Sequence, residues 1–146
     1  MFGLGNLLFG KKVTVNTQIG TFEARVKKNS SKNSIWTADI TSKTENTAVY
    51  LLLVGNEKGP NESQIETVQF IQNNMESIKA QIVAIIENDK DLKREFQAQR
   101  IADFHLSYIG SLKDSKVNFE LSFERKNDEG YIGATFKDQK ITEVNF

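Results

Sequence analysis

Residues 60–87 read "PNESQIETVQFIQNNMESIKAQIVAIIE", and the spacing of their apolar side chains predicts a long helix. Pro60 fits at or just before a first helical turn, Asn61 can cap the free backbone N–H groups, and Glu62 suits the positive end of the helix dipole. Apolar residues then recur every three or four positions and form one stripe: Ile65, Val68, Ile71, Met75, Ile78, Ile82 and Ile85. A helix over residues 61–87 would be about 40 Å long, enough to cross a small sheet.

The same apolar stripe fits two structures, a cover for a sheet or the seam of a coiled coil. We favour the cover, because the stripe lasts only about three heptads and lies between two strand-rich segments. The following "ENDKD" is expected to break or bend the helix, and "LKREFQAQR" predicts a shorter helix that contacts the core through Leu92 and Phe96. The helical region is therefore expected as one long helix followed by a short one.

The segment before the helix, residues 13–54, alternates between apolar and polar side chains, which predicts four strands in succession. Short connections between them favour an antiparallel meander. In "IWTADIT", Trp36 shares a face with Ala38 and Ile40, so we expect it in the core, with an exposed partner contact as the alternative. The fourth strand, "TAVYLLLVG", is apolar on both faces, as is typical of a strand covered on both sides.

The segment after the helix predicts four more strands, "DFHLSYIGSL", "KVNFELSFER", "GYIGATF" and "ITEVNF", the last two joined by a "KDQK" turn. In the first of them, Tyr108 is expected on the same face as Phe104 and Leu106, opposite His105 and Ile109. The second alternates most regularly, so its apolar side chains are expected in the core: Val117, Phe119, Leu121 and Phe123.

The order of strands, helix and strands predicts an α+β fold. We expect an antiparallel sheet of about seven to eight strands, four before the helix and about four after, with one long helix packed across one face. The length of 146 residues fits a single domain over residues 13–146. Residues 1–12, "MFGLGNLLFGKK", form an apolar segment that is too short to span a bilayer and lacks the features of a secretory signal. We expect it to dock on the domain or fray, and the alternative is a weak membrane-binding or partner-binding arm.

The composition excludes several classes of site. Nineteen Lys and Arg balance nineteen Asp and Glu, so no strong field is expected to attract nucleic acid. The absence of Cys and the presence of a single His exclude disulfides, thiol nucleophiles, and cysteine or multi-histidine metal centres. No phosphate-binding glycine motif and no nucleophile elbow occurs, so we predict no cofactor, no metal and no catalytic residue.

Three polar residues on the predicted strands are candidate chemical groups. His105 has no activating partner in the sequence, and we interpret it as a surface or structural residue. Glu120 and Glu124 lie on the polar face of one strand, about 13 Å apart, whereas the carboxylate pairs of glycosidases are at most about 9.5 Å apart. We therefore interpret both glutamates as part of a solvated face.

The helix start and the closing hairpin together resemble a group of small bacterial domains of unknown function. In that group a proline and a glutamine mark the start of the long helix, where this chain has Pro60 and Gln64. The closing hairpin of the group carries Asp, Glu, His and Gly before an "IGVxF" strand. Here "NDEGYIGATF" supplies Asp128, Glu129 and Gly130, and the histidine has no counterpart.

The resemblance covers roughly residues 20–146 and implies a shared fold. Some members of the group occur near toxin genes and have been suggested to act as immunity proteins, which implies a protein-binding role here. The chain departs from the pattern of the group at Arg125 and Lys126, where a tryptophan or a cysteine is often found.

Together these features predict a cytoplasmic, non-enzymatic module, immunity-like or regulatory, whose partner is another protein and neither a nucleic acid nor an integral membrane component. The candidate partner contacts are Asp128, Glu129 and Tyr131, beside Gly130, which is expected to need a backbone conformation that a side chain would resist. Two alternatives remain. One is a small enzyme that uses carboxylates or Tyr108 and Tyr131 in a cleft. The other is a structural or chaperone-like homodimer, formed through a sheet edge or the long helix.

Overall fold

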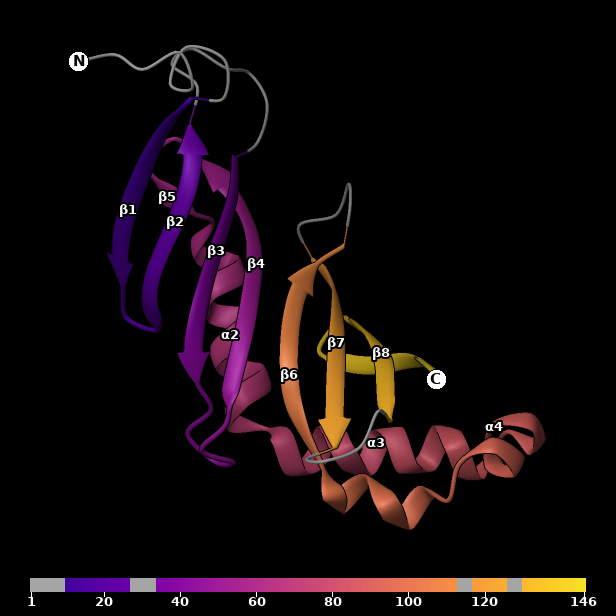
Figure 1. The fold of residues 1–146 in the computed structure, drawn as a ribbon. Helices are drawn as coiled ribbons and strands as arrows, with labels where there is room; N and C mark the ends of the chain where they lie inside the picture. The colour runs from indigo at the N-terminus through magenta and orange to yellow at the C-terminus, as the bar shows by residue number, and fades with distance from the viewer. Residues whose placement is uncertain (1–9, 27–33, 113–116, 126–129) are drawn as a thin grey trace.

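The computed structural model of the chain describes residues 10–26, 34–112, 117–125 and 130–146. Over these residues the fold is α+β, as predicted: a nine-stranded, mostly antiparallel sheet with helices packed against it (Figure 1). The four predicted strands before the helices are present, and a two-residue strand follows them: β1 (Lys11–Thr17), β2 (Gly20–Val26), β3 (Ser34–Thr41), β4 (Ala48–Asn56) and β5 (Gly59–Pro60).

The helices and the second group of strands follow in chain order. Three α-helices and a 3₁₀-helix come first: α2 (Glu62–Asn73), α3 (Met75–Glu87), α4 (Lys90–Glu95) and η1 (Ala98–Asp103). All four strands predicted after the helices are present: β6 (Phe104–Ser111), β7 (Asn118–Arg125), β8 (Tyr131–Lys137) and β9 (Lys140–Asn145).

The sheet contains one parallel seam. Its strands follow the order β1, β2, β3, β4, β6, β7, β8, β9, with β5 paired to β4, and every pair is antiparallel except β4 and β6. The seam is parallel because the helices between these strands carry the chain back to the end of the sheet where β4 began. It covers only three residue pairs, and the strands diverge on either side of them (Figure 1): Tyr50↔Tyr108, Leu51↔Ile109 and Leu52↔Gly110.

The predicted long helix is divided in two at Asn74. The Asn74 side chain donates from Nδ2 to the Phe70 carbonyl at 2.8 Å, the acceptor that its backbone N–H would use in a continuous α-helix. The backbone N–H donates instead to the Ile71 carbonyl, at 3.3 Å. As a result α2 lies behind β3 and β4, while α3 takes a new direction and contacts β9 (Figure 1).

The start of α2 also differs from the prediction. Asn61 occupies the N-cap position, but its side chain makes no capping hydrogen bond. The backbone carbonyl of Asn61 accepts from the N–H groups of Gln64 and Ile65, at 3.1 and 3.2 Å. Pro60 belongs to β5 and lies just before the first helical turn, which agrees with the prediction for this residue.

The core lies between the helices and one face of the sheet, and most of its predicted members are confirmed. Six of the seven stripe residues are buried, while Ile85 is only partly buried and its neighbour Ile86 is fully buried. Trp36 is fully buried, and its Nε1 donates to a backbone carbonyl of β4 at 2.9 Å. Leu92 and Phe96 pack against the core from outside, as expected.

Three predicted side-chain directions are wrong. The register of β6 against β7 shifts between Leu106 and Tyr108, so one extra residue, Ser107, reverses the alternation of the strand. Tyr108 therefore points away from the core and Ile109 is fully buried, the opposite of the prediction. Val117 precedes β7 and is 63% exposed, although it was expected in the core.

Candidate functional site

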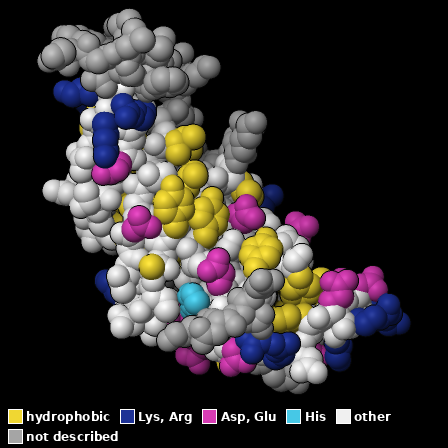
Figure 2. Space-filling view, viewed as in Figure 1, with side chains coloured by type: hydrophobic (Ala, Val, Ile, Leu, Met, Phe, Trp, Pro, Cys, Tyr) yellow, Lys and Arg dark blue, Asp and Glu magenta, His cyan; other side chains and the backbone are white. Residues whose placement is uncertain are grey.

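The face of the sheet opposite α2, the open face, displays hydrophobic side chains over its middle (Figure 2). Opposed residues of neighbouring strands point the same way, so the strand register arranges the side chains in rows across the sheet. The first row crosses six strands: Asp39, Tyr50, Tyr108, Ser122, Gly133 and Asn145. The second row lies beside it: Thr37, Leu52, Gly110, Glu120, Thr135 and Glu143. A third row, on the other side of the first, holds His105, Glu124 and Tyr131.

Three tyrosines supply the largest side chains of these rows. Tyr50 and Tyr131 are 41% and 43% exposed, and Tyr108 is partly buried. The rings of Tyr50 and Tyr108 stack across the parallel seam, with centroids 6.2 Å apart and planes within 15° of each other. The Tyr131 hydroxyl donates a hydrogen bond to Asn145 Oδ1 at 3.4 Å. The rings are therefore held in place by neighbouring strands.

Glycines allow two of these rings to lie along their strands. A Cβ atom at Gly110 would overlap the hydroxyl end of Tyr108, and one at Gly133 would lie 2.7 Å from the Tyr131 hydroxyl. Residues two positions apart on a strand face the same way, so the glycine leaves the space that the ring occupies. Both tyrosines begin a "YIG" tripeptide, and this repeated spacing is a sequence signal that the strand predictions overlooked.

Carboxylates accompany the tyrosines across the open face. Asp39 is the cross-strand neighbour of Tyr50, and Glu124 is the cross-strand neighbour of Tyr131. Glu120 is the cross-strand neighbour of Gly110, over which the Tyr108 ring extends. Between β3 and β8, the described residues of the three rows include no Lys or Arg. These six side chains together form the tyrosine face: Tyr50, Tyr108, Tyr131, Asp39, Glu120 and Glu124.

The surroundings of Tyr108 decide the protonation of its hydroxyl. Burial raises the pKa of this group above its usual 10.0, and the charge of Glu120 and the neighbouring Tyr50 raise it further. Like any tyrosine hydroxyl it is protonated at neutral pH, and the raised pKa keeps it a hydrogen-bond donor to more alkaline pH.

Replacing Tyr108 with phenylalanine should reduce the loss of stability at alkaline pH. The folded protein holds the Tyr108 proton more tightly than the unfolded chain does, so this contribution is present below pH 10.0 and is lost as the pH rises through the folded pKa. We expect the free energy of unfolding to fall more steeply between about pH 9 and 11 in the wild type than in Tyr108→Phe. Urea unfolding at each pH measures both slopes, and equal slopes would contradict the prediction.

The predicted partner contacts fall partly on this face. Tyr131 is exposed and belongs to the tyrosine face, whereas Asp128 and Glu129 lie outside the described residues. The expectation for Gly130 is wrong, because its φ is not positive and an added Cβ would meet the Phe104 ring at an ordinary contact distance of 3.6 Å. A side chain at position 130 is therefore compatible with the fold.

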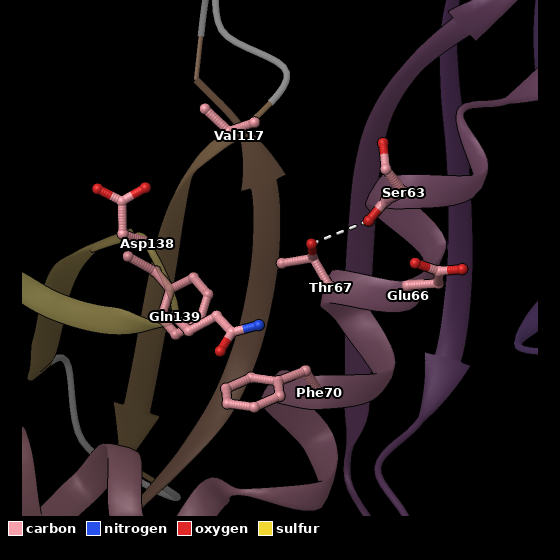
Figure 3. Close-up of a pocket in the computed structure, with 8 residues that line it drawn as sticks. Ser63, Glu66, Thr67, Phe70, Val117, Asp138 and Gln139 are labelled. Atoms are coloured by element: carbon pink, nitrogen blue, oxygen red, sulfur yellow. Dashed lines mark hydrogen bonds between the residues drawn. The ribbon is translucent and has the colours of Figure 1, made fainter.

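A groove of about 490 Å³ lies elsewhere, between α2 and the turn of the closing hairpin (Figure 3). Residues of α2 form one wall, and the other is formed by Val117, which precedes β7, and by residues of β8 and the hairpin turn. The lining residues are Ser63, Glu66, Thr67, Phe70, Val117, Phe136, Asp138 and Gln139. The Thr67 hydroxyl is engaged within α2, where it donates to the Ser63 carbonyl at 2.9 Å. The enzymatic alternative names carboxylates or Tyr108 and Tyr131 in a cleft. Neither tyrosine lines this groove, and the carboxylates that do are those of Glu66 and Asp138.

The described residues offer no metal site and no membrane-spanning helix. Within the described residues, no three Asp, Glu or His side chains gather closely enough to hold a metal ion. The helices that the structure describes include none long and apolar enough to cross a membrane. Comparisons with protein-family models, with curated proteins and with solved structures find no match to this chain. The resemblance to small bacterial domains therefore stays a prediction that rests on its motifs.

Proposed function

We propose that this protein is a non-enzymatic protein-binding module, of an immunity-like or regulatory kind, that contacts its partner through the tyrosine face. The observation that carries the proposal is the gathering of three tyrosines on the face of the sheet opposite α2. Tyrosine is enriched at protein interfaces, because its rigid ring buries apolar area while its hydroxyl keeps a hydrogen bond.

The tyrosine side chains are positioned before any partner binds. The Tyr50 and Tyr108 rings stack on each other, and the Tyr131 hydroxyl is bonded to Asn145. A side chain that is already restricted loses less conformational entropy on association, so more of its contact energy contributes to affinity. This arrangement favours a binding surface over a set of incidental exposed rings.

The open face is wide enough for an interface of ordinary size. Its first row crosses six strands. Neighbouring strands lie ~4.8 Å apart, so the row is about 24 Å wide. Stable interfaces bury about 800 Å² on each partner, an area of comparable width. Apolar rings at the centre with carboxylates beside them also match the usual division of an interface into an apolar core and a polar rim.

Replacing both Tyr50 and Tyr131 with alanine should greatly weaken binding of the partner. We expect the amount of partner captured from the native host to fall about tenfold or more, because exposed aromatic rings at the centre of an interface supply much of its affinity. Quantitative mass spectrometry of the material bound to the tagged protein measures the change. Val117→Ala is the matched control, since Val117 is an exposed apolar residue in the groove beside α2 and should leave capture unchanged.

The outcomes of this capture experiment separate the alternatives. Undiminished capture by the double alanine variant, with its fold verified by thermal unfolding, would show that the contact lies elsewhere. Failure to recover any stoichiometric protein under gentle conditions would contradict the binding function itself. A molar mass that doubles with concentration in light scattering would favour the homodimer.

A further inference from the structure

We infer that the partner presents arginine side chains to the tyrosine face, an inference that rests on the proposed function and specifies the chemistry of its partner. The tyrosine face combines aromatic rings with carboxylates and contains no cationic side chain. This combination is suited to a guanidinium group, which can stack on an aromatic ring and bind a carboxylate at the same time.

The negative charge of the tyrosine face is a local excess. The chain carries 19 basic and 19 acidic residues, so it is neutral as a whole. On the same side of the sheet, basic residues lie on β1 and β2, where Lys12 forms an ion pair with Glu23 at 3.4 Å. Figure 2 shows acidic side chains among the hydrophobic ones in the middle, with Lys and Arg toward the edges. A cationic partner surface is therefore attracted to the middle of the face, and an anionic one is repelled.

The carboxylates lie beside the rings, and this favours arginine over lysine. The charge of Glu120 is close enough to Tyr108 to contribute to the raised pKa of its hydroxyl. A planar guanidinium can donate two parallel hydrogen bonds to such a carboxylate while its plane rests on the adjacent ring. A lysine ammonium is compact and strongly hydrated, so it gains less from the ring.

The spacing of the carboxylates fits several cationic side chains and not a single ion. Glu120 and Glu124 are four residues apart along β7, which is about 13 Å at the rise of a strand. Asp39 lies on β3, and β4 and β6 separate that strand from β7. A partner with two or more arginines on one surface can therefore occupy the tyrosine face at separate points.

Short peptides of defined charge test the inference. The full chain, isotope-labelled, is titrated at low salt with capped tetra-arginine, tetra-lysine and tetra-glutamate, and the backbone amide shifts are followed by NMR. We expect tetra-arginine to shift the amides of Tyr50, Tyr108 and Glu120, and to bind about fivefold more tightly than tetra-lysine. Tetra-glutamate should leave these amides unshifted.

Charge-neutral variants locate the binding. Glu120→Gln combined with Glu124→Gln removes two charges at nearly constant size and should weaken tetra-arginine binding about fivefold or more. Glu62→Gln combined with Glu66→Gln is the matched control, because it removes two exposed carboxylates of α2 and should leave the affinity unchanged. Thermal unfolding verifies that both double variants remain folded.

Two results would overturn the inference: equal affinity for tetra-arginine and tetra-lysine, or unchanged tetra-arginine affinity in the Glu120 and Glu124 variant. The host capture experiment distinguishes this failure from failure of the proposed function. If the Tyr50 and Tyr131 alanine variant loses the partner while the glutamine variant keeps it, the binding module stands and the arginine inference fails. If both variants keep the partner, both proposals fail.

Discussion

Replacing Glu45 with alanine should lower the free energy of unfolding by about 3 kcal/mol. In the loop between β3 and β4, the Glu45 carboxylate joins three segments: Oε2 lies 3.0 Å from Lys79 Nζ of α3, and Oε1 accepts from the Leu106 N–H of β6 at 3.2 Å. The Glu45 and Lys79 side chains are only 16% and 19% exposed, so water can replace little of the lost ion pair and hydrogen bond. The free energy is lost because the mostly buried Lys79 ammonium and the Leu106 N–H both lose the Glu45 carboxylate as an acceptor.

A second ion pair of similar length provides the control for Glu45. Glu87 and Lys93 lie 2.9 Å apart, but their side chains are 40% and 59% exposed. Glu87→Ala should therefore change the free energy of unfolding by less than about 0.5 kcal/mol. Urea unfolding of both variants gives the comparison, and similar losses in the two would show that burial is not what makes the Glu45 contact strong.

Replacing Gln64 with leucine should lower the free energy of unfolding by about 2–3 kcal/mol. The Gln64 side chain is fully buried, and its Oε1 accepts from the Val54 N–H at 2.8 Å while its Nε2 donates to Ser111 Oγ at 3.0 Å. Leucine keeps nearly the same volume, so the main loss is the acceptor of the partly buried Val54 N–H and not a cavity.

The measurement for Gln64 combines chemical denaturation with hydrogen exchange. Gln69→Leu is the control, because Gln69 lies on the same helix and is partly exposed, and its substitution should change stability by less than about 0.5 kcal/mol. In Gln64→Leu the Val54 amide should exchange faster than in the wild type. Unchanged exchange at Val54 would contradict the assigned role of this hydrogen bond even if the protein were destabilised.

Glu45 and Gln64 act at the two ends of the parallel seam between β4 and β6. The seam itself has three residue pairs, so the strands leave backbone groups unpaired where they diverge. Glu45 accepts from β6 at one end, and Gln64 bridges β4 and β6 at the other. From the sequence, Gln64 could be identified only as a marker of the helix start, and Glu45 had no predicted role. These roles are hidden in the sequence because the hydrogen-bond partners are far apart along the chain. Leu106 is 61 residues from Glu45, and Ser111 is 47 residues from Gln64.

The tyrosine face was only partly predictable. Tyr131 was identified as a candidate contact, and it is exposed on the open face. Tyr108 was expected on the same face as Phe104 and Leu106, because strict alternation along β6 does not reveal the extra residue at Ser107. Tyr50 was not singled out, since a strand that is apolar on both sides suggested cover on both faces. The three rings come together only through the register of β4, β6, β7 and β8.

Local periodicity was enough to establish the eight long strands, the apolar stripe of the helices and the burial of Trp36. These features follow from which side chains share a face, and the backbone repeat of a strand or helix determines that within a few residues. The parallel seam, the turn of the chain at Asn74 and the reversed phase of β6 were decided only in the tertiary structure. The seam and the phase of β6 depend on hydrogen bonds between distant segments. The helix break at Asn74 depends on a side chain that takes the hydrogen-bond acceptor of its own backbone N–H. Neither kind of interaction appears in the pattern of apolar residues.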